Sequence, residues 1–250
     1  MEKSPEQIAR EKLHHSLQRK MRQASMQYGL LQDGDRILIG LSGGKDSLAL
    51  VELLGEQAQI YVPHIEVLAV HVSVENIGYQ SDLDYLKQFC TQHHVRFVHR
   101  VTRYEEQAPS HQNKTHCFLC AHYRRKALLA AAKELNCNKI AFGHHRDDIL
   151  QTLLMNMIYD GNISTMPPRL QLDKMPIQII RPLCLIDEKD LAQYAQMVGY
   201  RQQVKQCPFE HDSSRTRVCD LFKELEQLNP NVRDSLWAAM NNIKNQYLIN

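Results

Sequence analysis

The stretch that decides the fold is ILIGLSGGKDSLAL, residues 37–50. Its apolar start, flanked by glycine, predicts a short buried strand over residues 36–41. Leu48, Val51 and Leu54 recur at helical spacing, so a helix follows the strand. The residues between the two elements are a Gly-Gly pair, a lysine and two serines, which suit an anion site at the start of a helix.

Strands and helices alternate from this stretch onward. The further predicted strands are 65–72, 95–101 and 138–143, and the predicted helices are 5–28, 47–54, 81–94, 121–136 and 147–159. Such alternation predicts parallel β-α-β units with helices on both faces of the sheet. The predicted fold class is therefore α/β, a doubly wound and mostly parallel sheet with an N-terminal helix and a helical C-terminal extension.

The last third of the chain is less regular. Four prolines within residues 166–183 predict a loop that can include a hairpin or an edge strand. Asp187 can cap a helix that runs to about Val198, and the tail from Asp212 is mostly helical, with a break at Asn229-Pro230. We expect three segments, a helical arm (1–34), an α/β domain (35–200) and a helical extension (201–250).

Composition and cysteine content limit the class of protein. The chain has 250 residues, of which 43% are hydrophobic and 23% charged, enough for a core in a globular protein. No apolar run approaches the about 18 residues of a membrane span, and the charged N-terminus does not resemble a signal peptide. We therefore expect a cytoplasmic protein with no membrane partner. Seven cysteines, an odd number, argue for metal or thiolate chemistry rather than disulfides.

Positive charge gathers at the N-terminus. Residues 1–28 contain six Lys or Arg against three Glu, a balance of +3, whereas the whole chain carries +2. A basic helical arm can follow the phosphates of a nucleic acid, and it can equally be a solvated helix face. Charge alone does not choose between these interpretations.

The loop at Ser42 differs from the common phosphate-binding loops. A Walker A loop requires G-x-x-x-x-G-K-[ST]. Here Asp46 follows Lys45 where the pattern has Ser or Thr, and Gly40 lies one position after the place of the first glycine. The dinucleotide pattern G-x-G-x-x-G is also absent. A chance Gly-Gly turn is the alternative. Because the loop joins the first strand to its helix, we expect it at the carboxyl edge of the sheet, where such folds bind ligands.

Cys117 and Cys120 form a C-x-x-C pair with metal-binding spacing. They follow the polar loop 110–120 rather than a strand, which argues against a thioredoxin-like redox pair. Cys207 precedes Pro208 in an irregular loop, a setting typical of iron–sulfur cluster ligands. Three thiolates on a four-iron cluster leave one iron open to a substrate sulfur. Zinc would instead need a fourth ligand, for which the candidates are His116, His122 and His211. Core packing is predicted for Cys90, Cys137 and Cys184.

The motifs together resemble a known family. SGGKDS (42–47) resembles the PP-loop signature of the adenine-nucleotide α-hydrolase superfamily. With the cysteines, the chain is similar to the tRNA-cytidine 2-sulfurtransferase (TtcA) family. The other stretches that carry the resemblance are CFLCAHYRR (117–125), GHHRDDILQTLLMNM (143–157), MPP (166–168), IIRPL (179–183) and QCPFE (206–210). Lysidine synthetases share the PP-loop but not the cysteines, and uridine 2-thiolases carry paired terminal C-x-x-C motifs that this sequence lacks.

This resemblance implies functional residues. A pyrophosphate unit of ATP would be held by Ser42, Gly43, Gly44 and Ser47 and neutralised by Lys45. Asp46 would place Mg²⁺ or orient the substrate, and Val72 and Gly143 would face the nucleotide from the ends of two strands. Asp147 or Asp148 would lie near Mg²⁺ or the adenylation centre, although both also suit the first turn of a helix. The implied ligands of a [4Fe–4S] cluster are Cys117, Cys120 and Cys207. Arg124 and Arg125 would meet RNA phosphate or be exposed helix residues.

The implied activity is ATP-dependent tRNA thiolation. The C2 oxygen of a cytidine, usually at position 32 of the anticodon loop, would attack ATP and release pyrophosphate, and sulfur would then replace the resulting adenylate. The product would be 2-thiocytidine. A cysteine desulfurase would be the sulfur donor, and a homodimer is a possible assembly. The chain departs from longer relatives at Glu210, where some have another cysteine, and in its short C-terminal region. Rival functions are thiolation of another base, amidation of a small carbonyl, and a zinc-stabilised RNA-binding protein.

Overall fold

The strands form one mostly parallel sheet in the computed structural model, which describes residues 3–60, 62–75, 81–103, 116–201 and 214–247. Within these ranges the sheet has six strands in the order β3-β2-β1-β4-β6-β5. Their bounds are Arg36–Gly40 (β1), Glu66–Val74 (β2), Arg96–Thr102 (β3), Lys139–Ala141 (β4), Arg169–Gln171 (β5) and Gln178–Ile180 (β6). Only β5 and β6 pair in antiparallel fashion among the described strands. The predicted doubly wound α/β class is confirmed.

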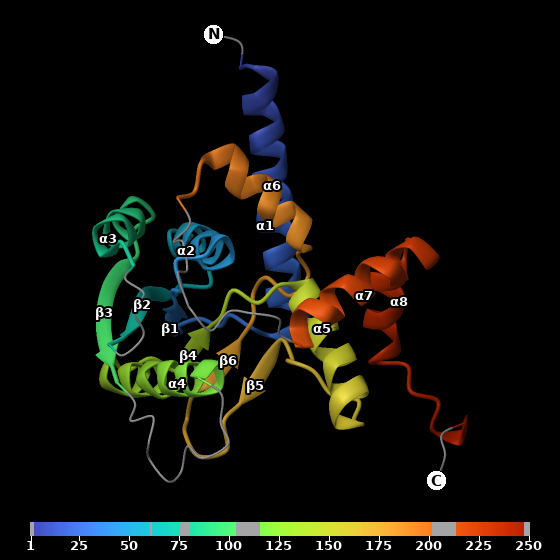
Figure 1. Ribbon diagram of the computed structural model, residues 1–250. Coiled ribbons are helices and arrows are strands. Elements are labelled where there is room, and N and C mark those ends of the chain that lie inside the picture. Colours follow the sequence, from blue (N-terminus) through green and yellow to red (C-terminus); the bar gives the residue numbers. More distant parts are fainter. Residues whose placement is uncertain (1–2, 61, 76–80, 104–115, 202–213, 248–250) are drawn as a thin grey trace. The chain divides into compact units, whose positions relative to one another are not determined.

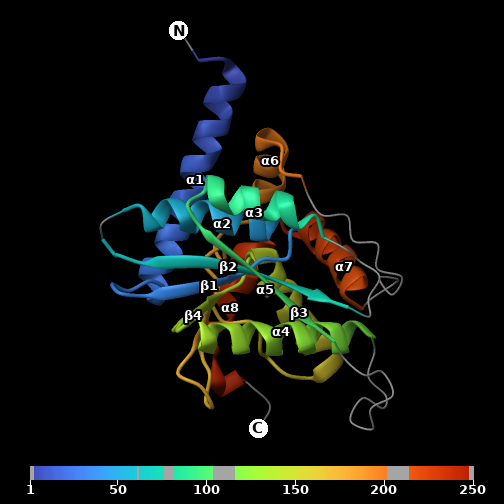
Figure 2. The same ribbon diagram turned by 90° about the vertical axis from the view of Figure 1, so that its left-hand side faces the viewer.

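Helices cover both faces of the sheet. The helices are Pro5–Tyr28 (α1), Lys45–Ala58 (α2), Leu83–Gln92 (α3), His116–Glu134 (α4), Arg146–Met155 (α5), Glu188–Val198 (α6), Ser214–Leu228 (α7) and Val232–Ala239 (α8). In Figures 1 and 2, α2 and α3 lie over one face and α4 over the other. Alternate residues of β2, Leu68, Val70 and Val72, pack against Leu128 and Ala131 of α4, as the period of a strand requires. Within the described ranges, no helix is both long enough and apolar enough to cross a membrane.

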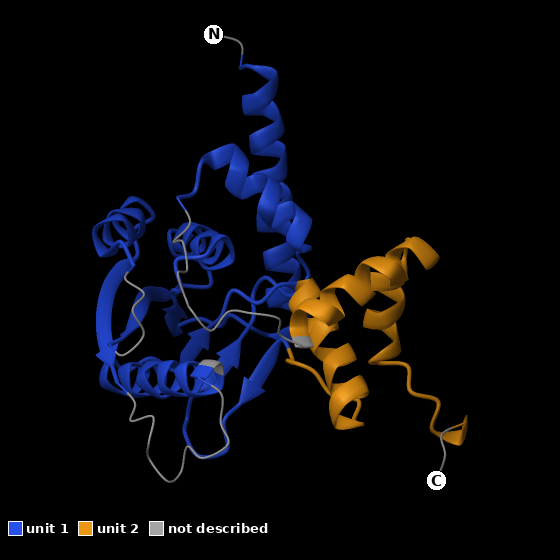
Figure 3. Cartoon of the chain, viewed as in Figure 1, with its two compact units in different colours: residues 1–145, 168–210 blue, residues 146–167, 211–250 orange. Residues whose placement is uncertain are grey.

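The chain divides into two compact units (Figure 3), residues 1–145 with 168–210 and residues 146–167 with 211–250. Unit 1 contains the sheet, and unit 2 contains α5, α7 and α8. Unit 2 has its own apolar core, which includes Leu150, Phe222 and Val232. This grouping differs from the three predicted segments, because residues 146–167 join the C-terminal helices. The division into segments at residues 34 and 200 therefore stays a prediction.

Two predicted helix bounds need correction. The helix expected from residue 121 begins at His116, so the C-x-x-C pair lies within its first turns rather than in the preceding loop. Leu119 explains the earlier start, because it is buried against Val74 of β2. The helix expected over residues 147–159 changes to a π-helical turn over Asn156–Asp160. The hairpin expected within residues 166–183 is present as β5 and β6.

Helix α1 is defined at both ends by its sequence. The hydroxyl of Ser4 accepts a hydrogen bond from the Gln7 amide at 3.2 Å, and the Ser4 amide donates to the Gln7 side chain at 2.9 Å. Pro5 occupies the first helical position, where its missing N–H costs nothing. Gly29 ends the helix at a φ of 61°, which suits glycine. The predicted bounds of this helix, residues 5–28, are confirmed.

Candidate functional site

The loop of Ser42 lies where the order of the strands reverses. From β1 the chain passes through α2 to β2 on one side, while β4 pairs with β1 on the other. Gly143 follows β4 and approaches α2 so closely that an added Cβ atom would lie 3.0 Å from the carbonyl oxygen of Asp46. Such reversals at the carboxyl edge are where open α/β sheets bind ligands. The loop and Gly143 therefore meet at the expected edge.

Ser47 organises the loop from within. Its Oγ accepts hydrogen bonds from the amides of Ser42 at 3.2 Å and Gly43 at 3.1 Å, and it lies 2.9 Å from the carbonyl oxygen of Gly44. Ser47 is buried, so these bonds are shielded from water. Gly43 has a φ of 84°, which explains the need for glycine at this position. These hydrogen bonds show a loop of fixed conformation, which argues against a chance Gly-Gly turn.

The loop ends at an anion-binding terminus. Gly44 is the N-cap of α2 and offers no side chain to cap the amides of the first helical turn. These amides carry the positive end of the helix dipole, so a phosphate oxygen would satisfy them. Lys45 adds a positive charge, and its ammonium lies 3.3 Å from Asp46 and 3.2 Å from Glu188 of α6. Partial burial lowers the pKa of Lys45, but the negative charges of Asp46 and Glu188 have the larger effect, so the pKa is raised overall. The site fits a pyrophosphate unit.

His71 of β2 holds the entrance of the loop. Its Nδ1 lies 2.8 Å from the carbonyl oxygen of Leu41, the residue before Ser42. Burial lowers the pKa of His71, with Arg124 and His99 nearby adding to the effect. A neutral imidazole bonded to a carbonyl must carry its proton on Nδ1. His71 therefore donates this bond and fixes the backbone where the loop begins.

The C-x-x-C pair lies at the start of α4. Cys117 and Cys120 are three residues apart on one helix, so both positions fall on one face. Cys120 is half-buried and packs with Leu119 against Val74, at the carboxyl end of β2. This placement fits two ligands of one metal group. Cys207 and His211 lie outside the described residues, so the proposed third ligand stays a prediction.

Three other cysteines are core residues, as predicted. Cys90, Cys137 and Cys184 are buried. Burial raises the thiol pKa to about 12 for Cys90 and Cys184 and to about 11 for Cys137. A thiol that stays protonated at neutral pH is a poor metal ligand. These three residues are therefore unsuited to hold a metal.

Arg124 and Arg125 differ in their surroundings. Arg124 is half-buried, four residues after Cys120 on the same side of α4, and its Nε is buried with no hydrogen-bond partner in the described residues. Arg125 is exposed and donates to the backbone of its own helix at 3.2 Å. The interpretation as an exposed helix residue thus holds for Arg125 and is wrong for Arg124.

Asp147 and Asp148 open α5 in unit 2. Asp147 is buried and accepts two hydrogen bonds from Arg233, at 2.8 and 2.6 Å, while Asp148 pairs with Arg215. Both lie in the first helical turn, where acidic residues are stabilised by the helix dipole. Asp46 belongs to unit 1, whereas Asp147 and Asp148 belong to unit 2. The predicted action of Asp147 or Asp148 at Mg²⁺ stays a prediction.

Glu188 and His71 belong to none of the sequence motifs, whereas Val72 was expected to face the nucleotide. Glu188 follows the expected cap Asp187, and nothing local to it indicates an ion pair with a lysine 143 positions earlier. His71 has a weak signal, because it is a lone polar residue within the apolar run of β2. Val72 is buried against α4, so only its backbone could meet a nucleotide, and that contact also stays a prediction.

The fold and the loop define a class of protein. The family model of the PP-loop domain matches residues 13–218. This match includes the loop, Gly143 and the whole of the sheet, so the chain is a PP-loop protein.

Comparison with known proteins narrows the class. The tRNA-cytidine(32) 2-sulfurtransferase of Paraburkholderia phymatum is 33% identical over 98% of this chain and 73% of its own length. The tRNA-cytidine(32) 2-sulfurtransferase 1 of Francisella tularensis is 34% identical over 93% of this chain and 87% of its own. The U34-tRNA thiolase NcsA of Methanococcus maripaludis, solved with its [4Fe-4S] cluster, superimposes with a TM-score of 0.75 at 25% identity, covering 94% of this chain and 81% of that one. The chain belongs to the tRNA-cytidine 2-sulfurtransferase family.

Proposed function

We propose that the chain is an ATP-dependent tRNA sulfurtransferase that converts a cytidine, at position 32 of the anticodon loop, into 2-thiocytidine. The observation that carries the proposal is the uncapped start of α2 beside Lys45, on the same sheet edge as the C-x-x-C pair. The relatives named for this activity match nearly the whole chain. An anticodon loop is single-stranded, so its base can enter a pocket without breaking a helix.

The PP-loop supports the activation step. The C2 oxygen of the base attacks the α-phosphorus of ATP, a new P–O bond forms, and the bond to the β-phosphate breaks. Pyrophosphate leaves, and Lys45 with the first amides of α2 would stabilise its charge. Ser47 and His71 keep the loop in place while this charge develops. The base now carries AMP on C2, and AMP is a much better leaving group than an amide-like oxygen.

The second step replaces oxygen with sulfur. A sulfide sulfur forms a bond to C2, the C2–O bond breaks, AMP leaves and one proton is lost to solvent. Cys117, Cys120 and Cys207 would hold a [4Fe–4S] cluster, which when bound leaves one iron open to carry the incoming sulfur. Cys120 lies beside the end of β2, the parallel neighbour of β1. The activating loop and the cysteine pair therefore share one edge of the sheet.

Other residues and partners belong to the same proposal. Asp46 would help place the Mg²⁺ that accompanies ATP, since carboxylate oxygens are its preferred ligands. Arg124, half-buried one turn after Cys120, would neutralise an anion brought to this edge. A cysteine desulfurase would supply the sulfur in the cytoplasm.

Anaerobic purification tests the proposal. We expect a brown protein that contains iron and labile sulfide in equal amounts and absorbs at about 400 nm. We also expect it to release pyrophosphate only in the presence of tRNA. Cys207→Ala should lose the iron, whereas Cys219→Ala, a change outside the proposed ligands, should retain it. Stoichiometric zinc without iron, together with no pyrophosphate release, would instead support a zinc-stabilised RNA-binding protein.

A further inference from the structure

One face of α1 carries positive charge that nothing in the proposed chemistry uses. From Lys12 to Tyr28 the helix has four Lys or Arg residues, Lys12, Arg19, Lys20 and Arg22, and no acidic residue at all. The sequence alone left two interpretations of this charge, a solvated helix face and a surface for nucleic acid. The structure separates them because it shows which side of α1 is buried.

The buried side of α1 fixes its orientation. Leu17, Met21 and Ala24 are buried, and α1 packs against α2 and α6 of the same unit (Figures 1 and 2). Lys20 lies beside this contact, where it pairs with Asp190 of α6 at 2.7 Å. One of the four basic residues is therefore already neutralised by the protein.

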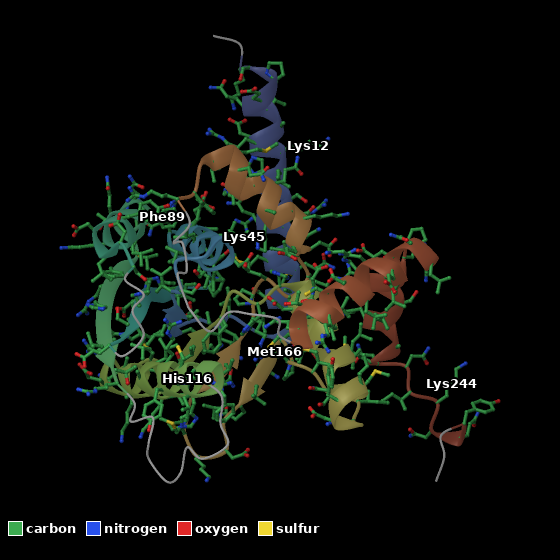
Figure 4. All side chains as sticks on the ribbon, in the orientation of Figure 1. Lys12, Lys45, Phe89, His116, Met166 and Lys244 are labelled. Carbon is green, nitrogen blue, oxygen red and sulfur yellow. The ribbon has the colours of Figure 1, made fainter. Side chains whose placement is uncertain are left out.

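The opposite side forms a continuous exposed row. Lys12, His15, Arg19 and Arg22 are spaced by three, four and three residues, so they lie on one face of the helix. All four are exposed, and Lys12 is labelled in Figure 4. We call this row the Lys12 face.

The positive charge of the Lys12 face is not neutralised by carboxylates among the described residues. Among the described residues no carboxylate pairs with Lys12 or Arg19, and Arg22 donates only to the neutral amide of Gln57, at 3.3 Å. A solvated helix normally alternates acidic and basic residues four positions apart, because like charges at this spacing repel. A basic face without acidic residues is stabilised most by a bound partner that carries several negative charges in a row.

The chemistry of the face favours a sugar–phosphate backbone. Ten residues separate Lys12 from Arg22, about 15 Å along a helix, so the row can reach more than one phosphate of a strand. The face carries no Trp, Tyr or Phe to stack on a base, which points to positioning rather than sequence recognition. Ile8 and Met26, 54% and 86% exposed, are the large apolar residues in line with the row, whereas a helix that lies on a membrane presents a broad apolar face.

We propose that the Lys12 face of α1 docks the phosphate backbone of the tRNA substrate. The identity of the RNA rests on the proposed function, but the docking does not depend on catalysis. Because α1 belongs to the same compact unit as the PP-loop, RNA held on this face is held by the body that carries the activating site.

A double variant, Lys12→Gln with Arg19→Gln, tests the proposal. Binding of unmodified tRNA to the full-length protein, without ATP, is measured by fluorescence anisotropy over a series of salt concentrations. We expect the Kd to rise about tenfold at about 0.1 M salt, and the slope of log K against log salt to fall by about 1.5, since each lost phosphate contact removes about 0.7 to 0.9. The matched control is Lys133→Gln with Lys174→Gln, which removes the same charge from exposed positions on α4 and in the β5–β6 connection.

The outcomes separate this proposal from the proposed function. A Kd that does not change, or that rises equally in both double variants, overturns docking on this face. The double variant can also keep its tRNA binding but lose a binding to vesicles of anionic phospholipid that the wild type shows. That result overturns RNA docking in favour of docking to a membrane surface. A tenfold weaker tRNA complex confirms the docking even if the wild type forms no thiolated nucleoside. That last result would contradict the proposed function alone.

Discussion

The ammonium of Lys45 lies 3.2 Å from the carboxylate of Glu188, the first residue of α6. The pair joins the phosphate-binding loop to a helix much later in the chain. Pyrophosphate bound in the loop would need the same ammonium. Glu188 therefore competes with the ligand for the charge of Lys45.

This competition gives a prediction for Glu188→Gln. The Glu188 side chain is 49% exposed, so the pair is worth no more than about 1 kcal/mol, and its loss should tighten ATP binding about two- to fivefold. Titration calorimetry with ATP in the absence of tRNA measures the change. Asp190→Asn, which removes a carboxylate from the same helix but pairs with Lys20, should leave the affinity within a factor of two. Equal effects in both variants, or weaker binding in Glu188→Gln, would contradict the competition.

Gly143→Ala should disturb the nucleotide site through its backbone. The new Cβ atom would lie 3.0 Å from the carbonyl carbon and oxygen of Asp46 and 3.1 Å from the amide nitrogen of Ser47, so the start of α2 must shift. We expect ATP affinity to fall about tenfold or more, as misplacement of about 1 Å is costly in such sites. Gly161→Ala is the control, because no atom lies within 4 Å of its added Cβ. It should lower stability through its φ of 64° and leave ATP binding intact, and unchanged ATP binding in Gly143→Ala would be inconsistent with the close approach.

Lys139 should be a major contributor to stability. Its side chain is 2% exposed, and its ammonium lies 2.6 Å from Asp35 and donates to the carbonyl of Leu30 at 2.8 Å. Lys139→Met leaves the Asp35 carboxylate buried without its cation, so we expect the free energy of unfolding to fall by about 3 to 5 kcal/mol in urea denaturation. Arg100→Gln breaks the more exposed pair with Glu134 and should cost less than about 1 kcal/mol. Equal losses in the two variants would show that burial does not set the difference.

The stability of α1 should depend on pH through His14. Tyr194 donates its one hydroxyl proton to Glu52 at 2.6 Å, so His14 Nδ1, 2.8 Å away, must donate to the Tyr194 oxygen. His14 Nε2 lies 3.0 Å from Glu56, so both ring nitrogens carry protons. The hydrogen bond to Glu56 and the charges of Glu56 and Glu52 accordingly raise the pKa of His14, against the effect of burial.

A raised pKa in the folded state fixes the sign of this effect. The stabilisation is complete below the unfolded-state pKa of about 6.5 and is lost as pH rises through the higher folded-state value. The unfolding free energy of the wild type should therefore fall by about 1 kcal/mol over that range relative to His14→Gln. His15→Gln, on the exposed side of α1, serves as the control. Parallel pH profiles for wild type and His14→Gln would refute the protonated network.

Local patterns in the sequence were sufficient for most of the fold. The alternation of apolar runs with helical spacing predicted β1 to β4 and also α1. The start of α4 was predicted five residues too late, because the burial of Leu119 against Val74 is a tertiary contact that local polarity conceals. The π-helical turn after Met155 likewise has no signal in a 3.6-residue period.

The candidate site was predictable where its residues form a motif. SGGKDS and CFLC each place several candidate groups within one turn or loop, so the sequence locates them, while the resemblance to a known family implies their roles. Glu188 could not be found this way, since only folding brings it to Lys45. The same holds for His71, whose bond to Leu41 depends on the pairing of β1 with β2.

The activity proposed for this chain is the synthesis of 2-thiocytidine in tRNA. The most direct measurement is mass spectrometry of nucleosides from tRNA of a strain that lacks the gene, complemented with the wild type or with Cys120→Ala. We expect 2-thiocytidine to disappear in the deletion strain, to return with the wild type and to stay absent with Cys120→Ala. Normal levels of 2-thiocytidine in the deletion strain, or loss of a different thiolated nucleoside in its place, would contradict it.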